Sequence, residues 1–119
     1  MTCNCKQEDT TIEVTFGCSK ELTFDFDSDL DGYTAQFCVR ADLDTAPVLT
    51  KTISDLTGTS LTFELSTSDN SVFSFDSNED VAQYIWGLDV YDETSRTPVF
   101  PQTGQMPPLF LVFKHVAGI

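Results

Sequence analysis

The residues best placed to do chemistry are three aspartates in one short turn. Asp27, Asp29 and Asp31 each stand one residue apart, and Gly32 follows them. Alternating carboxylates can converge on a hard cation, and a glycine permits the sharp turn that such a loop needs. The segment therefore fits the beginning of a calcium loop, with a backbone carbonyl near Tyr33 as a further ligand.

The same segment then departs from the calcium-loop pattern. The position where a bidentate Glu closes an EF-hand loop is Cys38, and a strand pattern follows where the EF-hand has a helix. The alternative is a solvated Asp-Gly turn, because both residues tolerate turn geometry. We therefore predict weak calcium binding at most, and the sequence indicates no other cofactor.

Nucleophilic catalysis requires a Ser or Cys beside a base, which is commonly His. The chain has a single histidine, His115, and no glycine-rich elbow that presents a serine. Cys38 and His115 can be considered on paper as such a pair, but a structural role for both is the simpler interpretation. The sequence thus predicts a protein that is not an enzyme.

The four cysteines are Cys3, Cys5, Cys18 and Cys38. Their spacing differs from the paired spacing of structural zinc sites, which favours ordinary thiols over a zinc site. The chain begins without the apolar run of a signal peptide, which predicts synthesis in a cytoplasm, where thiols stay reduced. We expect all four cysteines to be unpaired.

The charge balance restricts the kinds of partner. The chain carries 19 Asp and Glu against 6 Lys and Arg, a formal net charge of -13. Phosphate backbones and anionic membrane surfaces are bound mainly by Lys and Arg, so neither nucleic acid nor a membrane is an expected partner. The longest apolar run, Leu109 to Phe113, is too short to span a bilayer.

The elements that must position these residues are strands. Apolar and polar residues alternate almost throughout, which is typical of half-buried strands, and helical periodicity is nearly absent. Strands are predicted near residues 12–16, 22–26, 33–40, 48–53, 61–65, 84–91, 99–100 and 109–116. This pattern predicts an all-β fold, an antiparallel immunoglobulin-like β-sandwich of about eight or nine short strands. Residues 1–10 are predicted to be a flexible N-terminal arm and residues 11–119 a single domain.

The aromatic residues of the strand near 84–91 are predicted to face in two directions. Tyr84 and Trp86 alternate to the side that also carries Leu88, which indicates the core. Tyr91 falls on the opposite face. It is therefore the plausible exposed platform on which a sugar ring could stack.

The last strand is apolar on both of its faces. Leu109, Leu111 and Phe113 form one face, and the other carries Phe110, Val112 and Val116. Such a strand is either central in its sheet and covered by a loop, or covered by another chain. We predict that Phe110, Val112 and Val116 form an interface with another subunit. Because like subunits of this charge repel one another, a less acidic partner is favoured.

The chain resembles the immunoglobulin-like β-sandwich modules of phage virion proteins, such as the N-terminal module of baseplate upper proteins. The likeness covers about residues 22–116. It rests on Phe24-Asp25-Phe26 leading to Asp31-Gly32-Tyr33, on the strand ending Val39-Arg40, on Tyr84 to Tyr91, and on the closing strand after Gly104. Pro107-Pro108 departs from the family pattern, and no catalytic residue belongs to it.

The resemblance implies a non-enzymatic structural role in a phage virion, as a capsid decoration, neck, tail or baseplate accessory protein. The expected partners are other virion proteins or copies of the chain itself, assembled into the virion in the host cytoplasm. The alternative is a free-standing β-sandwich module that binds carbohydrate or calcium.

Overall fold

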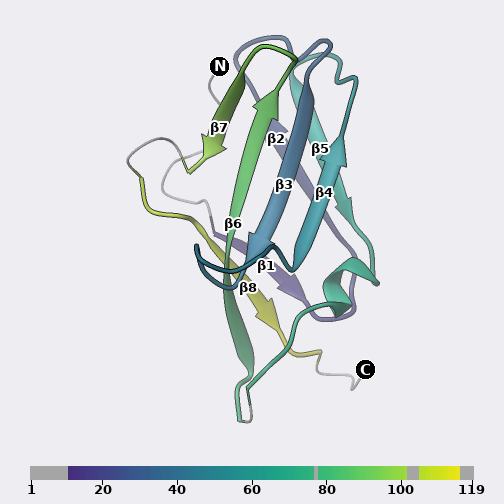
Figure 1. Cartoon of the computed structure of the whole chain (residues 1–119). Coiled ribbons are helices and arrows are strands. Elements are labelled where there is room, and N and C mark those ends of the chain that lie inside the picture. Colours follow the sequence, from purple (N-terminus) through teal and green to yellow (C-terminus); the bar gives the residue numbers. More distant parts are fainter. Residues whose placement is uncertain (1–10, 77, 102–104, 116–119) are drawn as a thin grey trace.

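The computed structural model describes residues 11–76, 78–101 and 105–115, which form eight strands and one 3-10 turn (Figure 1). The strands are β1 (Ile12–Thr15), β2 (Lys20–Asp25), β3 (Thr34–Arg40), β4 (Leu49–Ile53), β5 (Ser60–Leu65), β6 (Val81–Tyr91), β7 (Arg96–Phe100) and β8 (Leu109–Phe113), and the turn is η1 (Asp69–Ser71). Within these residues, no helix is long and apolar enough to cross a membrane.

The larger of two sheets has the strand order β1-β8-β6-β3-β4, with β7 also paired to β6. The long strand β6 organises it. One edge of β6 pairs with β3, while the other edge pairs first with β8 and then, nearer its C-terminal end, with β7. Between those two neighbours, the N–H of Trp86 donates to the carbonyl of Pro108 at 3.1 Å.

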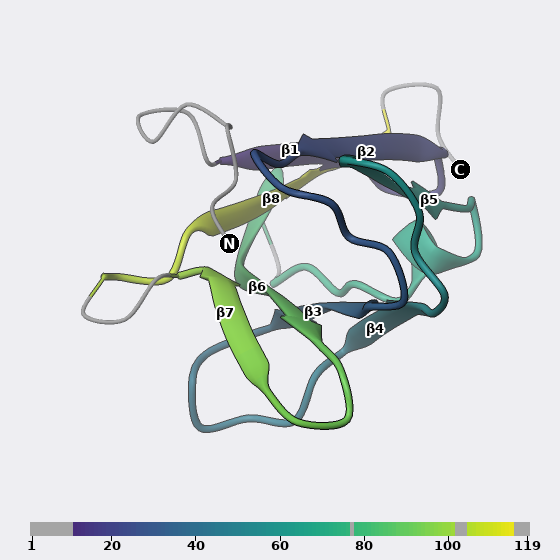
Figure 2. The same cartoon turned by 90° about the horizontal axis from the view of Figure 1, so that it is seen from above.

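The second sheet consists of β2 and β5, which pair antiparallel. Figure 2 shows the large sheet curving round so that the two sheets enclose a common interior. The predicted all-β sandwich of two sheets and about eight strands is confirmed. One detail of the prediction is wrong: the sheets are not wholly antiparallel, because β1 runs parallel to β8. These two strands come from opposite ends of the chain, so no short hairpin dictates their direction.

The core lies between the sheets and is built from the alternating positions that the sequence indicates. Ala35, Phe37 and Val39 of β3 are fully buried, and Trp86, which lies opposite Val39 on the neighbouring strand β6, is buried on the same side of the sheet. The ring of Phe37 contacts three other aromatic rings, those of Phe63, Trp86 and Phe110, at centroid separations of 5.6, 5.6 and 6.2 Å. Phe37 therefore joins the two sheets at the centre of the aromatic cluster.

The segment between β5 and β6 closes the sandwich on the β5 side without being a strand. Phe73 is buried there, with its ring 5.3 Å from that of Phe110. Asn70 in η1 is fully buried, and its side-chain amide donates to the carbonyl of Cys18. After η1 the chain forms no further helical turn among the described residues before β6 begins at Val81.

Strand β4 is an edge strand that carries an inward-pointing charge. Lys51 lies opposite Phe37 in the β3–β4 register, and therefore on the core side of the sheet. Its Nζ donates to the Asp69 carboxylate at 2.9 Å, and the backbone N–H of Ser66 donates to the same oxygen at 2.8 Å. An inward-pointing charge is a known protection against edge-to-edge strand addition. The other sheet edges are therefore better candidates than β4 for pairing with a strand of another chain.

The Lys51–Asp69 contact leads to a pH-dependent stability. Burial by itself raises the pKa of Asp69, but the hydrogen bond and charge of Lys51 and the bonds from Ser66 lower it below the ordinary 3.8. A lowered pKa stabilises the fold above pH 3.8, and this contribution is lost as the pH falls through the folded-state pKa. We expect Asp69→Asn to lower the free energy of unfolding by about 1–2 kcal/mol at pH 7.

The measurement is urea unfolding of both proteins from pH 7 down to pH 3. The difference between them should shrink below about pH 4, because the wild-type carboxylate then becomes protonated. Asp44→Asn in the exposed loop after β3 is the matched control and should change little. A difference that stays constant over the whole pH range contradicts the ion-pair explanation.

Candidate functional site

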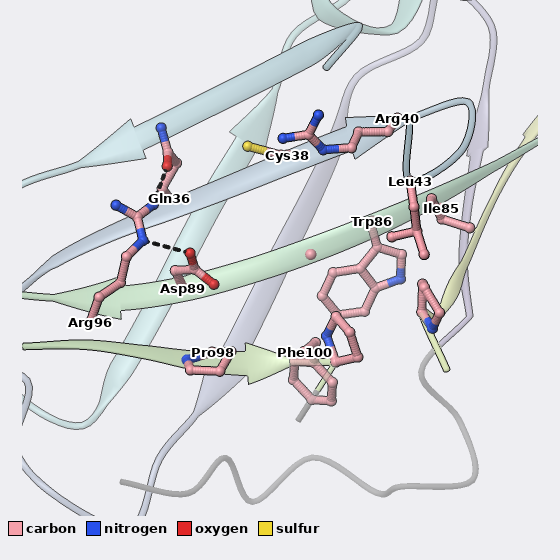
Figure 3. Close-up of a pocket in the computed structure, with 13 residues that line it drawn as sticks. Gln36, Cys38, Arg40, Leu43, Ile85, Trp86, Asp89, Arg96, Pro98 and Phe100 are labelled. Carbon is pink, nitrogen blue, oxygen red and sulfur yellow. Dashed lines mark hydrogen bonds and ion pairs between the residues drawn. The ribbon is translucent and has the colours of Figure 1, made fainter. Parts of the chain in front are cut away.

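A groove of about 310 Å³ lies on the outer face of the large sheet, across β3, β6 and β7 (Figure 3). Its floor is formed where Cys38 of β3 lies opposite Gly87 of β6. Gly87 is an outward position of β6 and has no side chain, so the sheet surface is hollow there. Three prolines line its β7 side: Pro98, Pro101 and Pro107.

One end of the groove is occupied by a fixed guanidinium. The Nε–H of Arg96 donates to Asp89 Oδ2 at 2.7 Å, and an Nη2–H donates to Gln36 Oε1. The Arg96 guanidinium also lies over the ring of Tyr91, 4.4 Å from its centroid. The hydrogen bond to Asp89 is the largest cause that raises the pKa of Arg96 above its ordinary value. These contacts hold the cation in one orientation (Figure 3).

Arg40 lies at the other end of the groove, beside Leu43 and Ile85 (Figure 3). One Nη1–H of Arg40 donates to the backbone carbonyl of Thr45 at 2.6 Å, which fixes the side chain against the loop after β3. Within the described residues, the ion pairs are Lys51–Asp69 and Arg96–Asp89, so Arg40 has no carboxylate partner there. Its positive charge is available to a ligand.

The groove therefore holds both arginines of a chain whose net charge is -13. Alternation with the buried Val39 places Arg40 on the outward side of β3, but the sequence alone does not connect it with Arg96. The sequence contained one usable signal, which is that Lys and Arg side chains are scarce in this chain. The positions of these few cations would have indicated both arginines as candidate binding residues. Their juxtaposition depends on the register among β3, β6 and β7, which the sequence alone does not supply.

The aspartates of the predicted calcium turn are not assembled into a site. Asp27, Asp29 and Asp31 are all exposed. The Asp31 carboxylate accepts the N–H of Gly58 at 2.9 Å, and that of Asp27 accepts the Ser28 hydroxyl at 3.2 Å. Among the residues that the structure describes, no group of three or more His, Cys, Asp or Glu side chains could hold a metal ion. The observed role of Asp31 is to tie its turn to the β4–β5 loop.

Calcium is therefore expected to change stability very little. At about 1 mM calcium, a site with a dissociation constant of about 1 mM or weaker raises the melting temperature by at most about 2 °C. Thermal unfolding with calcium, with magnesium as the matched control, checks this expectation. A large rise specific to calcium and abolished by Asp29→Ala contradicts it.

The predicted interface residues of the last strand lie on the core side. Phe110 and Val112 are fully buried within the chain itself, so no partner reaches them, and Val116 lies outside the described residues. The prediction of Phe110 and Val112 as interface residues is corrected accordingly. The outward face of β8 is formed instead by Leu109, Leu111 and Phe113.

That outward face of β8 adjoins two apolar outward positions of β6, which stand on either side of the exposed Gln83 opposite Leu111. In the β6–β8 register, Ile85 lies opposite Leu109 and Val81 opposite Phe113. All are outward positions by alternation with buried neighbours, and Leu109 is 36% exposed. We call this surface the β6–β8 outer face, and it consists of Val81, Ile85, Leu109, Leu111 and Phe113. Ile85 also lines the groove, so the two features adjoin.

The remaining sequence candidates do not form a site. Cys38 lies opposite Gly87, whereas His115 lies beyond the opposite end of β6, where Val81 pairs with Phe113, so the two are about 20 Å apart along the strand. Cys18 and Cys38 are free thiols, and Cys3 and Cys5 lie outside the described residues, as does the predicted N-terminal arm. Tyr91 faces outward as predicted, but Arg96 covers its ring.

No protein-family model matches the sequence, and no curated protein is significantly similar to it. Among solved structures, the chain is similar to the crystal structure of CBD12 from CALX1.2, with a TM-score of 0.45 and 13% sequence identity. The superposition covers 90% of this chain and 43% of that one. The chain thus spans less than half the length of that neighbour.

Proposed function

We propose that the chain is a non-enzymatic assembly component of a phage virion, part of a tail, neck, baseplate or capsid surface. In this proposal it binds other virion proteins or copies of itself through the outer face of its large sheet. The resemblance of its strand and turn residues to virion β-sandwich modules supports the proposed location in a virion. The surface of the sheet supports the mode of action.

The observation that carries the proposal is the β6–β8 outer face. A sheet in a two-layer sandwich needs one apolar face for its core, and Phe110 and Val112 already supply it for β8. Leu109, Leu111 and Phe113 add a second apolar face on the outside, which Gln83 of β6 and Glu13 of β1 flank at Leu111. Contiguous apolar residues on a surface are typical of protein interaction sites.

Charge favours a partner other than a second copy. Two chains of net charge -13 repel each other, whereas a less acidic virion protein does not oppose the contact to the same extent. The free-standing carbohydrate module is less well supported, because Arg96 occupies the ring face of Tyr91 on which a sugar would stack.

The proposal is tested on phage particles produced from the genome that encodes the chain. Particles purified through two successive density gradients are digested, and peptides of the chain are quantified against those of a known particle protein. The proposal predicts several copies per particle, resistant to a high-salt wash. Absence of the chain from purified particles, with the chain present in the producing cells, contradicts it.

A further inference from the structure

We infer that the groove across β3, β6 and β7 binds an acidic, partly apolar peptide segment of a partner protein. This inference deepens the proposed function by giving the chemistry of the partner. Arg40 and Arg96 at the two ends of the groove bind the acidic side chains of the segment, and the lining between them receives its apolar side chains.

The arginines have the hydrogen-bonding capacity that such a ligand requires. A guanidinium offers five N–H donors. Arg40 uses one on the carbonyl of Thr45, and Arg96 uses two on Asp89 and Gln36, so most donors of both remain available. Guanidinium groups bind carboxylates through short, charge-assisted bonds, often two at once. Because Arg40 has no carboxylate partner among the described residues, it is the stronger of the two anchors.

The groove has the length of a short extended peptide. Gln36, which holds Arg96, and Arg40 are separated by four residues along β3, about 13 Å in a strand. An extended ligand places two acidic side chains at that spacing when they are four residues apart. Between the ends, the lining is mainly apolar, with Ile85, Pro98 and Phe100 among its members.

Local charge outweighs net charge at this position. Charges more than about 8 Å away are largely screened at physiological ionic strength, so a bound carboxylate responds chiefly to the groups that line the groove. These are two arginines and one aspartate, and Asp89 is already paired with Arg96. Asp42 and Asp44 belong to the loop that Arg40 contacts, but neither lines the groove. The lining is therefore cationic in an acidic protein, which selects for an anionic segment.

The probe is the peptide acetyl-Glu-Pro-Leu-Val-Glu-amide, with the Gln-Pro-Leu-Val-Gln version as its matched neutral control. Binding to the full chain is followed by NMR titration, and the alkylation rate of Cys38 at the floor of the groove is measured by peptide mapping. Cys18 lies outside the groove and is the internal control. We expect the acidic peptide to bind about tenfold more tightly than the neutral one and to slow alkylation of Cys38 alone.

Arg40→Gln and Arg96→Gln are each expected to weaken binding of the acidic peptide about tenfold, whereas Lys20→Gln on β2 removes the same charge elsewhere without effect. The inference is overturned by equal affinity for both peptides, by unchanged affinity in the arginine variants, or by no binding up to about 5 mM peptide. Glucuronate binding as tightly as the peptide also overturns it in favour of a sugar ligand. Because the isolated chain is used, these results are independent of whether the chain is found in particles.

Discussion

The double substitution F110S/V112S is expected to unfold the chain at room temperature. Both side chains are fully buried, and Phe110 contacts the rings of Phe37 and Phe73. Removing a buried Phe costs about 3–5 kcal/mol, the truncated Val adds about 1–2 kcal/mol, and two hydroxyls then enter an apolar core. A small domain has only about 5–15 kcal/mol of stability in total. Circular dichroism and urea unfolding measure the outcome.

The matched control is L109S/L111S on the opposite face of the same strand. Leu109 is 36% exposed and Leu111 is half-buried, so this protein should stay folded and lose only about 1–2 kcal/mol. Equal loss of stability in the two double variants contradicts the assignment of the faces. A folded F110S/V112S protein contradicts it as well.

The second large effect is expected for Phe37→Ala. Phe37 is fully buried in β3, and its ring contacts Phe63 of the second sheet as well as Trp86 and Phe110 of its own sheet. Truncation leaves a cavity between the sheets and should lower the free energy of unfolding by about 3–5 kcal/mol. Urea unfolding with tryptophan fluorescence reports this change, because Trp86 adjoins the cavity.

Phe37→Leu separates packing from the mere presence of an apolar residue. It keeps most of the volume, and its cost should stay below about 2 kcal/mol. A cost for Phe37→Ala that is no larger than the cost for Phe37→Leu means that Phe37 does not join the two sheets.

The strands could be predicted from the sequence because most of them have one buried and one exposed face. In β3, the alternation of Ala35, Phe37 and Val39 with polar residues indicated both the strand and its inward side, and all three side chains are fully buried. The period of two is a local property that needs no knowledge of the neighbouring strands. The parallel direction of β1 against β8 is not local, and alternation does not encode it.

The orientation of β8 could not be read from its own residues, because both of its faces are apolar. The pairing of Tyr84 with Phe110 decides it, since Tyr84 points into the core and its partner must point the same way. A shift of one residue in that register would exchange the two faces. The sequence therefore indicated correctly that the strand is apolar on both faces, but the predicted interface residues Phe110 and Val112 lie on its buried face.

The groove was missed for the same physical reason. Arg40 and Arg96 are far apart in the sequence. They share a surface only because their strands, β3 and β7, both pair with β6. The aspartates of the turn, by contrast, form a local motif. Their spacing alone predicted a calcium site, yet in the structure the Asp31 carboxylate accepts a hydrogen bond from the backbone of the β4–β5 loop.

The most direct test of assembly through the β6–β8 outer face is competitive incorporation into particles. Wild-type chain and the L109D/L111D variant, each with a distinct tag, are produced together during phage growth, and their ratio in purified particles is compared with their ratio among soluble folded chains. The account predicts that the variant is depleted from particles at least about tenfold, because two buried carboxylates are costly at an apolar contact. Equal incorporation of both chains, or incorporation of neither, contradicts it.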